Sequence, residues 1–150
     1  MEYGYSLEVA SPPAGRVLEE LKAFLTGAGL GFASGIEHTA LVRDGGGRIA
    51  AAASLAGNVV KCVAVDPALQ GEGLTATLLT ALRQKALAAG RRRLFLYTKP
   101  ENRPQFTALG FHEVARAGEA VLMEDRRDGF DRWAQSIRSP AARGIVGTAV

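Results

Sequence analysis

Cysteine, long apolar runs and charge of one sign are all scarce in this sequence. Cys62 is the only cysteine among 150 residues, which excludes an internal disulfide and a zinc site built from cysteines. No apolar run approaches the roughly 20 residues that a membrane-spanning helix needs. The first residues, Met1 to Tyr5, have neither the basic start nor the apolar core of a signal peptide. We therefore expect a cytoplasmic protein with no membrane partner.

The net charge is only +3, which is small for a protein that binds nucleic acid. The one dense basic run, Arg91 to Arg93, falls between an expected helix and an expected strand. We interpret this run as a solvated turn, and we expect neither a nucleic-acid partner nor a metal site. The hydrophobic share of 47% and the charged share of 22% are ordinary for a globular domain.

The most informative stretch joins an apolar strand to a helix through a glycine-rich loop. Val59–Val65 is rich in β-branched residues, which predicts a buried strand. Asp66-Pro67 ends that strand, and a loop containing Gly71 and Gly73 leads into a helix with leucines at helical spacing. A helix start carries unpaired N–H groups and partial positive charge. The stretch therefore predicts a site for a phosphate or diphosphate.

The remaining pattern predicts an α/β fold, with a mixed, mostly antiparallel sheet and helices on both faces. A first helix should begin at Ser11, which can cap it, and end at Gly27. Further strands are expected at residues 5–9, 37–43, 48–55, 94–98, 111–115 and 120–124, and further helices at residues 101–109 and 128–137. Short turns join three consecutive strands into a meander, and the helix after the glycine loop implies a parallel crossover.

Two other phosphate-binding patterns match the loop incompletely. Gly71-x-Gly73-x-x-Ala76 fits a relaxed dinucleotide fingerprint. However, several residues separate its first glycine from the strand, a meander precedes that strand, and no ribose-binding acid follows about 20 residues later. A P-loop is excluded because no Gly-Lys-Ser/Thr follows the loop.

The loop resembles that of the GCN5-related N-acetyltransferase (GNAT) superfamily. The signature of that family is a strand followed by Gln/Arg-x-x-Gly-x-Gly/Ala at a helix start, and here Gln70 to Thr75 occupy those places. The later Gly110-Phe111 after a short helix also matches. The resemblance covers about residues 1–125 and implies an acyl-CoA N-acyltransferase fold that uses acetyl-CoA or coenzyme A. It assigns coenzyme A contacts to Val63, Ala64, Val65, Gln70, Gly71, Glu72, Gly73, Leu74, Thr75 and Phe106.

A closer resemblance is to the N-terminal domain of the citrate lyase ligase family. It rests on residues 57–65, 71–74, 95–99 and 121–124. It implies a partner, the acyl-carrier subunit of citrate lyase, whose coenzyme-A-derived prosthetic thiol is acetylated from acetate and ATP. Residues 126–138 would then form a C-terminal helix. Residues 139–150 would form a linker and the first strand of a nucleotidyltransferase domain that is missing from this chain.

Two positions depart from the GNAT pattern. Thr75 stands where glycine or alanine is usual, and Phe106 stands where many members have a tyrosine that protonates the departing thiolate. Phenylalanine has no proton to give, so we expect Tyr97 to be the substitute acid. Lys61 either reaches the cleft as a second catalytic group or points to solvent. Cys62, alone on an apolar strand, is better explained by packing than by nucleophilic chemistry.

Two functions follow from this pattern. The first is an acyl-CoA-dependent acyltransferase whose acceptor is a small molecule or an acyl-carrier thiol or amine. The second is a non-catalytic module that binds coenzyme A or the prosthetic arm of an acyl carrier protein. The missing tyrosine at Phe106 favours the second, while the glycine loop is compatible with both.

Overall fold

The computed structural model describes residues 4–125. These residues form two compact units, which divide after Tyr97. The seven described strands include both antiparallel and parallel neighbours. Among the described residues, no helix combines the length and the apolar character that crossing a bilayer requires.

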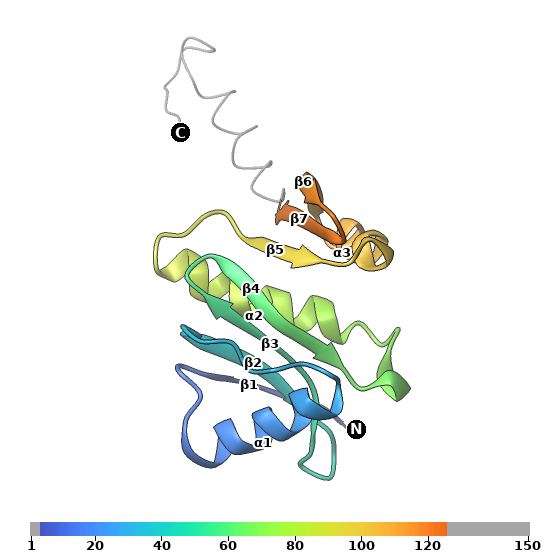
Figure 1. The fold of residues 1–150 in the computed structure, drawn as a ribbon. Helices are drawn as coiled ribbons and strands as arrows, with labels where there is room; N and C mark the ends of the chain where they lie inside the picture. Colours follow the sequence, from blue (N-terminus) through green and yellow to red (C-terminus); the bar gives the residue numbers. More distant parts are fainter. Residues whose placement is uncertain (1–3, 126–150) are drawn as a thin grey trace. The chain divides into compact units, whose positions relative to one another are not determined.

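The first unit is built on a sheet whose strands follow one another in the order β1-β2-β3-β4-β5 (Figure 1). Four of them pair in antiparallel fashion, and β5 pairs with β4 in parallel. Their bounds are β1 Ser6–Ala10, β2 His38–Arg43, β3 Ile49–Ala56, β4 Val59–Val65 and β5 Phe95–Thr98. The meander and the parallel crossover predicted from the sequence are therefore confirmed.

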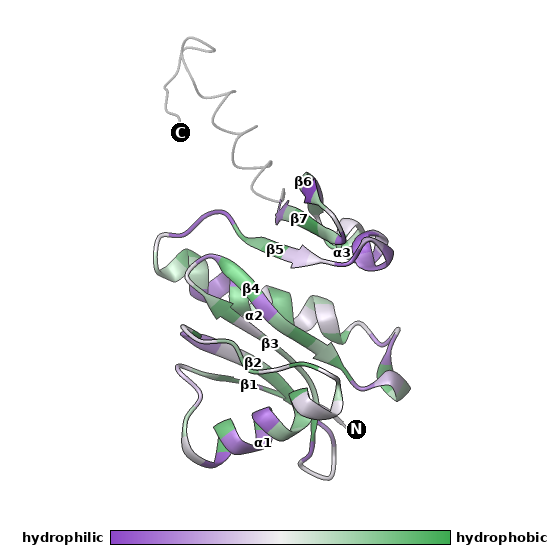
Figure 2. Ribbon diagram, viewed as in Figure 1, coloured by the Kyte–Doolittle hydropathy of each residue, from purple (hydrophilic) through white to green (hydrophobic). Residues whose placement is uncertain are grey.

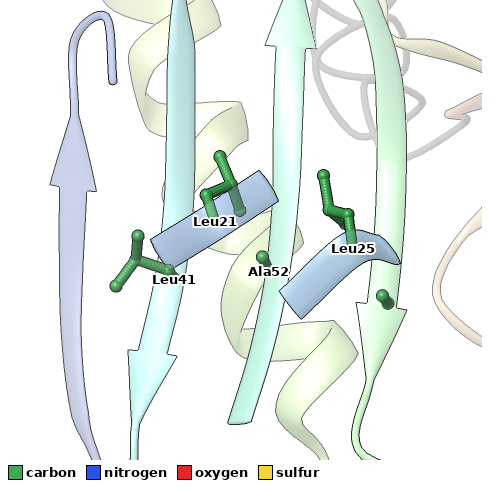
Figure 3. Packing of buried hydrophobic residues seen from close by; sticks show 5 residues of the cluster. Leu21, Leu25, Leu41 and Ala52 are labelled. Atoms are coloured by element: carbon green, nitrogen blue, oxygen red, sulfur yellow. The ribbon is translucent and has the colours of Figure 1, made fainter. Parts of the chain in front are cut away.

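Two helices cover opposite faces of this sheet. Helix α1 (Gly15–Gly27) lies on one face and helix α2 (Leu74–Ala88) on the other (Figures 1 and 3). Leu21 and Leu25 of α1 are fully buried. They pack in a cluster with Leu41, Ala52 and Ala64, and burying each leucine contributes about 1.5–3 kcal/mol.

Strand β3 lies between the two helices and is made largely of alanine. Ala50 to Ala53 are all buried, and their small side chains let both helices approach the sheet closely. Helix α2 contributes three fully buried leucines to the other face, Leu78, Leu79 and Leu82. Figure 2 shows the result: the central strands are mostly apolar, whereas α1 is polar on part of its surface.

The start of α1 differs from the prediction. The helix begins at Gly15, and its N-cap, Ala14, makes no side-chain cap. Ser11 does not cap the helix, because its hydroxyl is hydrogen-bonded to Nδ1 of His38 at 2.6 Å. Local rules assign the Ser11 side chain to the start of the helix, but in the structure it is hydrogen-bonded to a residue of a distant strand instead.

The second unit contains a short helix and a hairpin. Helix α3 (Arg103–Ala108) follows a 3-10 turn, and strands β6 (Phe111–Ala117) and β7 (Ala120–Asp125) pair in antiparallel fashion. The rings of Phe106 and Phe111 meet edge-to-face, with centroids 6.2 Å apart. The helix expected at residues 128–137 and the segments assigned to residues 126–138 and 139–150 lie outside the described residues.

Candidate functional site

The glycine loop is held at its start by Asp66, the last residue before the 3-10 turn η1 (Pro67–Leu69). The Asp66 backbone N–H donates to Ala50 O at 2.8 Å. Its side-chain Oδ1 accepts from the Ala68 N–H at 3.0 Å, and its carbonyl accepts from the Leu69 N–H at 2.8 Å. This arrangement, which sequence reasoning treated only as a strand stop, fixes the direction in which the loop leaves β4. The Asp-Pro pair is the sequence signal that could have revealed it.

Gly71 and Gly73 both adopt left-handed backbone conformations, with φ of +89° and +79°. A Cβ atom added at either position would meet no atom within 4 Å. Backbone conformation, rather than crowding, therefore favours glycine at both positions, and the positions that their Cβ atoms would occupy are open.

Helix α2 begins directly after Gly73, which is its N-cap. The first helical bond runs from the Thr77 N–H to Gly73 O at 3.2 Å. The amides of Leu74 and Ala76 precede this bond and so have no acceptor within the helix. Between Asp66 and Leu82 the sequence has no lysine or arginine. This segment itself therefore offers an anion only backbone N–H groups and the helix dipole.

Strands β4 and β5 pair only briefly. Their register joins Val59 to Phe95 and Val60 to Leu96, and no further β4–β5 pair follows in the described residues. The β4 edge that faces β5 is therefore unpaired from Lys61 to Val65. An extended ligand could add its own hydrogen bonds to this edge, as a peptide strand does in β-augmentation.

A β-bulge interrupts β4 at the point where β5 separates from it. Ser54 is paired with Lys61 and Ala52 with Ala64, so Cys62 and Val63 together oppose a single residue of β3. Cys62 has a left-handed backbone with φ of +57°, which is uncommon for a residue other than glycine. Nothing in the residue pattern of this strand indicated the bulge.

Cys62 also contacts the core. Its thiol lies 3.6 Å from Gly31 O, and its side chain packs against the cluster around Leu21 and Leu25. The packing interpretation of this cysteine is confirmed.

The predicted site residues are divided between the two units. Residues 61–75 and Tyr97 belong to the first unit, and Phe106 belongs to the second. Tyr97 is 66% exposed, whereas Phe106 is 6% exposed in its contact with Phe111. Lys61 is half-buried, the side chain of Thr75 is buried, and Glu72 is exposed to solvent.

The opposite end of β4 is fastened by an ion pair. Arg91 Nη1 donates to Glu37 Oε1 at 2.7 Å and to Gly57 O at 3.0 Å, and the Gly57 N–H donates to the same Glu37 oxygen at 3.1 Å. The hydrogen bond from Arg91 is the main cause of a lowered pKa of Glu37, and the hydrogen bond from the Gly57 N–H is the second cause. The interpretation of the basic run as a solvated turn is therefore wrong for Arg91. In the same run, the guanidinium carbon of Arg93 lies 5.3 Å from the centroid of the Phe95 ring.

Within residues 4–125, no three His, Cys, Asp or Glu side chains gather into a group that could hold a metal ion.

A family model described as an acetyltransferase (GNAT) domain matches residues 27–121. The chain is 47% identical over 91 residues to a [citrate [pro-3S]-lyase] ligase of Klebsiella pneumoniae, covering 60% of this chain and 27% of that protein. It is 34% identical over 106 residues to the enzyme of the same name from Haemophilus influenzae, covering 71% of this chain and 32% of that protein. The chain thus spans about a third or less of the length of these relatives.

Solved structures show the same fold. Escherichia coli ElaA superposes with a TM-score of 0.67 at 14% identity, covering 82% of this chain and 100% of that one. An acyl-CoA N-acyltransferase from Pseudomonas aeruginosa superposes with a TM-score of 0.68 at 15% identity, covering 81% of this chain and 99% of that one. The predicted fold class is therefore confirmed.

Proposed function

This chain belongs to the GNAT acetyltransferase family, and we propose that its first unit binds acetyl-CoA or coenzyme A and transfers an acyl group. The observation that carries the proposal is the loop after β4. Gly71 and Gly73 hold left-handed conformations there, with open space in front of them and a helix start behind them. An acyltransferase of citrate lyase ligase type is the activity that this site and these relatives support best.

The diphosphate of the coenzyme would bind the loop amides from Gly71 to Thr75, except that of Glu72, whose N–H donates to Leu69 O at 3.3 Å. Gln70 and Glu72 would line the approach, with the Glu72 carboxylate turned to solvent. The pantetheine arm would then run along the unpaired edge of β4 beside Val63, Ala64 and Val65, taking the place that β5 leaves open. When bound, acetyl-CoA supplies the activated thioester.

The reacting end of the coenzyme would lie near the start of the unpaired edge. The pantetheine arm would run from Val65 toward Lys61, where the unpaired edge begins. Lys61 and Tyr97 each lie one residue past the last β4–β5 pair. We assign both of them to the reacting end of the site.

In the transfer step, the acceptor nucleophile forms a bond to the thioester carbonyl carbon, and the carbon–sulfur bond breaks. The departing sulfur takes a proton, which the Tyr97 hydroxyl supplies in this proposal, and the proton that the acceptor thiol loses returns to the Tyr97 oxygen. Phe106 has no proton to donate and is assigned only a contact with the coenzyme. The acceptor would be the thiol of a coenzyme-A-derived prosthetic group on a citrate lyase acyl carrier, in the cytoplasm, and acetate and ATP would be used by the complete ligase.

A second candidate function is a module that binds coenzyme A or the prosthetic arm without turnover. The observation in its favour is Phe106, which replaces the usual tyrosine and is buried against Phe111.

One experiment separates the two candidates. Calorimetry measures binding of coenzyme A and acetyl-CoA to the full chain, and chromatography measures the coenzyme A released in the presence of a thiol acceptor. The acyltransferase requires binding with turnover. It also requires that Tyr97→Phe lower turnover by about 10²–10⁴-fold at unchanged affinity. Binding without turnover would establish the non-catalytic module, and Phe106→Tyr should then gain turnover because it restores the usual tyrosine. No binding of coenzyme A or acetyl-CoA would overturn both candidates.

A further inference from the structure

Three polar residues form a row across the face of the sheet that α1 covers. Thr39 of β2 is paired with Ser54 of β3, and Ser54 is paired with Lys61 of β4. Residues directly opposite in antiparallel strands project to the same face. The hydroxyls of Thr39 and Ser54 are fully buried and hydrogen-bonded to each other at 2.7 Å. We call these three residues the polar row.

The neighbouring row on the same face is entirely apolar. It pairs Leu41 with Ala52 and Ala52 with Ala64, and it is the surface on which α1 packs (Figure 3). The bulge at Cys62 and Val63 puts Lys61 and Ala64 on one face although they are three positions apart in the sequence. The polar row is therefore next to the apolar row on which α1 packs. Its last residue, Lys61, lies on β4 where β4 and β5 stop pairing.

Lys61 has no counter-ion in this environment. Within residues 4–125, its ammonium group makes no hydrogen bond and no ion pair, although the side chain is half-buried. The acidic residues that pair elsewhere in the unit are already engaged: Glu8 and Glu20 bind Arg43, and Glu37 binds Arg91. The half-buried part of a lysine is its aliphatic stem, and an ammonium without a partner at its end attracts an anion.

We infer that Lys61 binds a carboxylate carried by the substrate close to the reacting carbon, and so determines specificity. The inference rests on the proposed function, because that function brings the thioester to the first unpaired residue of β4. The adjacent buried hydroxyls make this part of the sheet polar where the α1 core is apolar. The carboxylate belongs either to the acyl group, as in a dicarboxylic acyl-CoA, or to the acceptor.

The first arm of the test concerns the acyl group. Calorimetry on the full chain compares succinyl-CoA with butyryl-CoA, whose acyl groups have equal chain length and differ in the terminal carboxylate. If the acyl group carries the carboxylate, succinyl-CoA binds at least about tenfold more tightly. Lys61→Met removes that preference and Lys61→Arg keeps most of it.

The second arm concerns the acceptor. Release of coenzyme A from acetyl-CoA is compared between 3-mercaptopropionate and 1-propanethiol as acceptors. If the acceptor carries the carboxylate, the acid has the lower KM by about tenfold or more, and Lys61→Met raises the KM of the acid by a larger factor than the KM of the neutral thiol.

Lys22→Met is the matched control, because Lys22 is exposed on α1 in the same unit and its replacement removes the same charge. This variant should keep whichever preference the wild-type chain shows. The inference is overturned if neither arm shows a preference for the compound that carries a carboxylate, and absence of transfer in the second arm counts as no preference. It is also overturned if the preference survives in Lys61→Met. If the inference about Lys61 fails in this way but coenzyme A still binds, the proposed binding function remains intact. If no form of the coenzyme binds, both the inference and the proposed function are overturned.

Discussion

The two ends of strand β4 are built in opposite ways. At its start, Arg91, Glu37 and Gly57 join three separate segments through charged hydrogen bonds, and the Phe95 N–H donates to Asn58 O at 2.9 Å. At its end, the loop from Gly71 to Gly73 is exposed, and the local bonds of Asp66 fix its direction. The difference teaches that one end uses its polar groups to hold the fold, while at the other end the amides of Leu74 and Ala76 have no acceptor within the helix.

The largest expected effect comes from two glycines with the same backbone. Gly73 at the ligand end and Gly90 after α2 both have φ of +79°, and a Cβ added at either one would lie in open space. Alanine at either position should cost about 1–2 kcal/mol of stability, because left-handed backbone is strained for residues with a Cβ. Calorimetry should find coenzyme A affinity reduced by about tenfold or more in Gly73→Ala.

Gly90→Ala is the control for that strain and should bind coenzyme A as the wild-type chain does. Equal losses of affinity in the two variants would show that general destabilisation, rather than the loop, controls binding.

A smaller loss of affinity is expected when the loop loses its anchor. Asp66→Ala removes the acceptor for the Ala68 N–H, which is worth about 1 kcal/mol, so coenzyme A should bind several-fold more weakly in calorimetry. Asp44→Ala removes a similar bond to Gly46 in the turn before β3 and should leave binding unchanged. An unaffected affinity in Asp66→Ala would argue that the loop does not need this anchor.

The start of β4 should respond in stability but not in binding. Glu37→Gln weakens the ion pair with Arg91, and we expect a small decrease in the thermal midpoint with no change in coenzyme A affinity. Glu19→Gln, on the exposed face of α1, should change neither. A loss of affinity in Glu37→Gln would mean that the two ends of β4 are coupled.

The smallest expected effect is on pH dependence. The pKa of Glu37 is lowered chiefly by the hydrogen bond from Arg91, and the pKa of Glu20 chiefly by the hydrogen bond from Arg43. A lowered folded-state pKa stabilises the fold above the unfolded value of about 4.3, and this stabilisation is lost as pH falls through the folded value. Urea midpoints of wild type and Glu37→Gln should therefore converge as pH falls from about 7 to about 3. A constant difference would contradict the pKa shift of Glu37.

Local rules sufficed for the part of the site that is local in sequence. The β-branched run before Asp66-Pro67 predicted β4, and the glycines after it predicted the loop and the start of α2. These features depend on neighbours within a few residues, so one sequence is enough to identify them. The coenzyme contacts and catalytic roles assigned to this stretch stay predictions.

Features that depend on distant partners were not predictable in the same way. Strict alternation would put Lys61 and Val63 on one face and Cys62 and Ala64 on the other, but pairing with β3 inserts a bulge and brings Lys61 and Ala64 to the same face. Ser11 is engaged by His38 instead of the helix end, and Arg91 by Glu37. Each of these outcomes is decided by a tertiary contact that the local pattern does not contain.

The extra residue in β4 is a local insertion, and its removal would leave the register on either side unchanged. Deleting either Cys62 or Val63 would restore strict alternation, with Lys61 still opposite Ser54 and Ala64 still opposite Ala52 on the same face. Val60 would stay in the buried interior. The deletion would instead straighten the strand where β5 separates from it, because a bulge bends the strand that carries it. The bulge therefore sets the course of the β4 edge rather than the choice of residues that are buried.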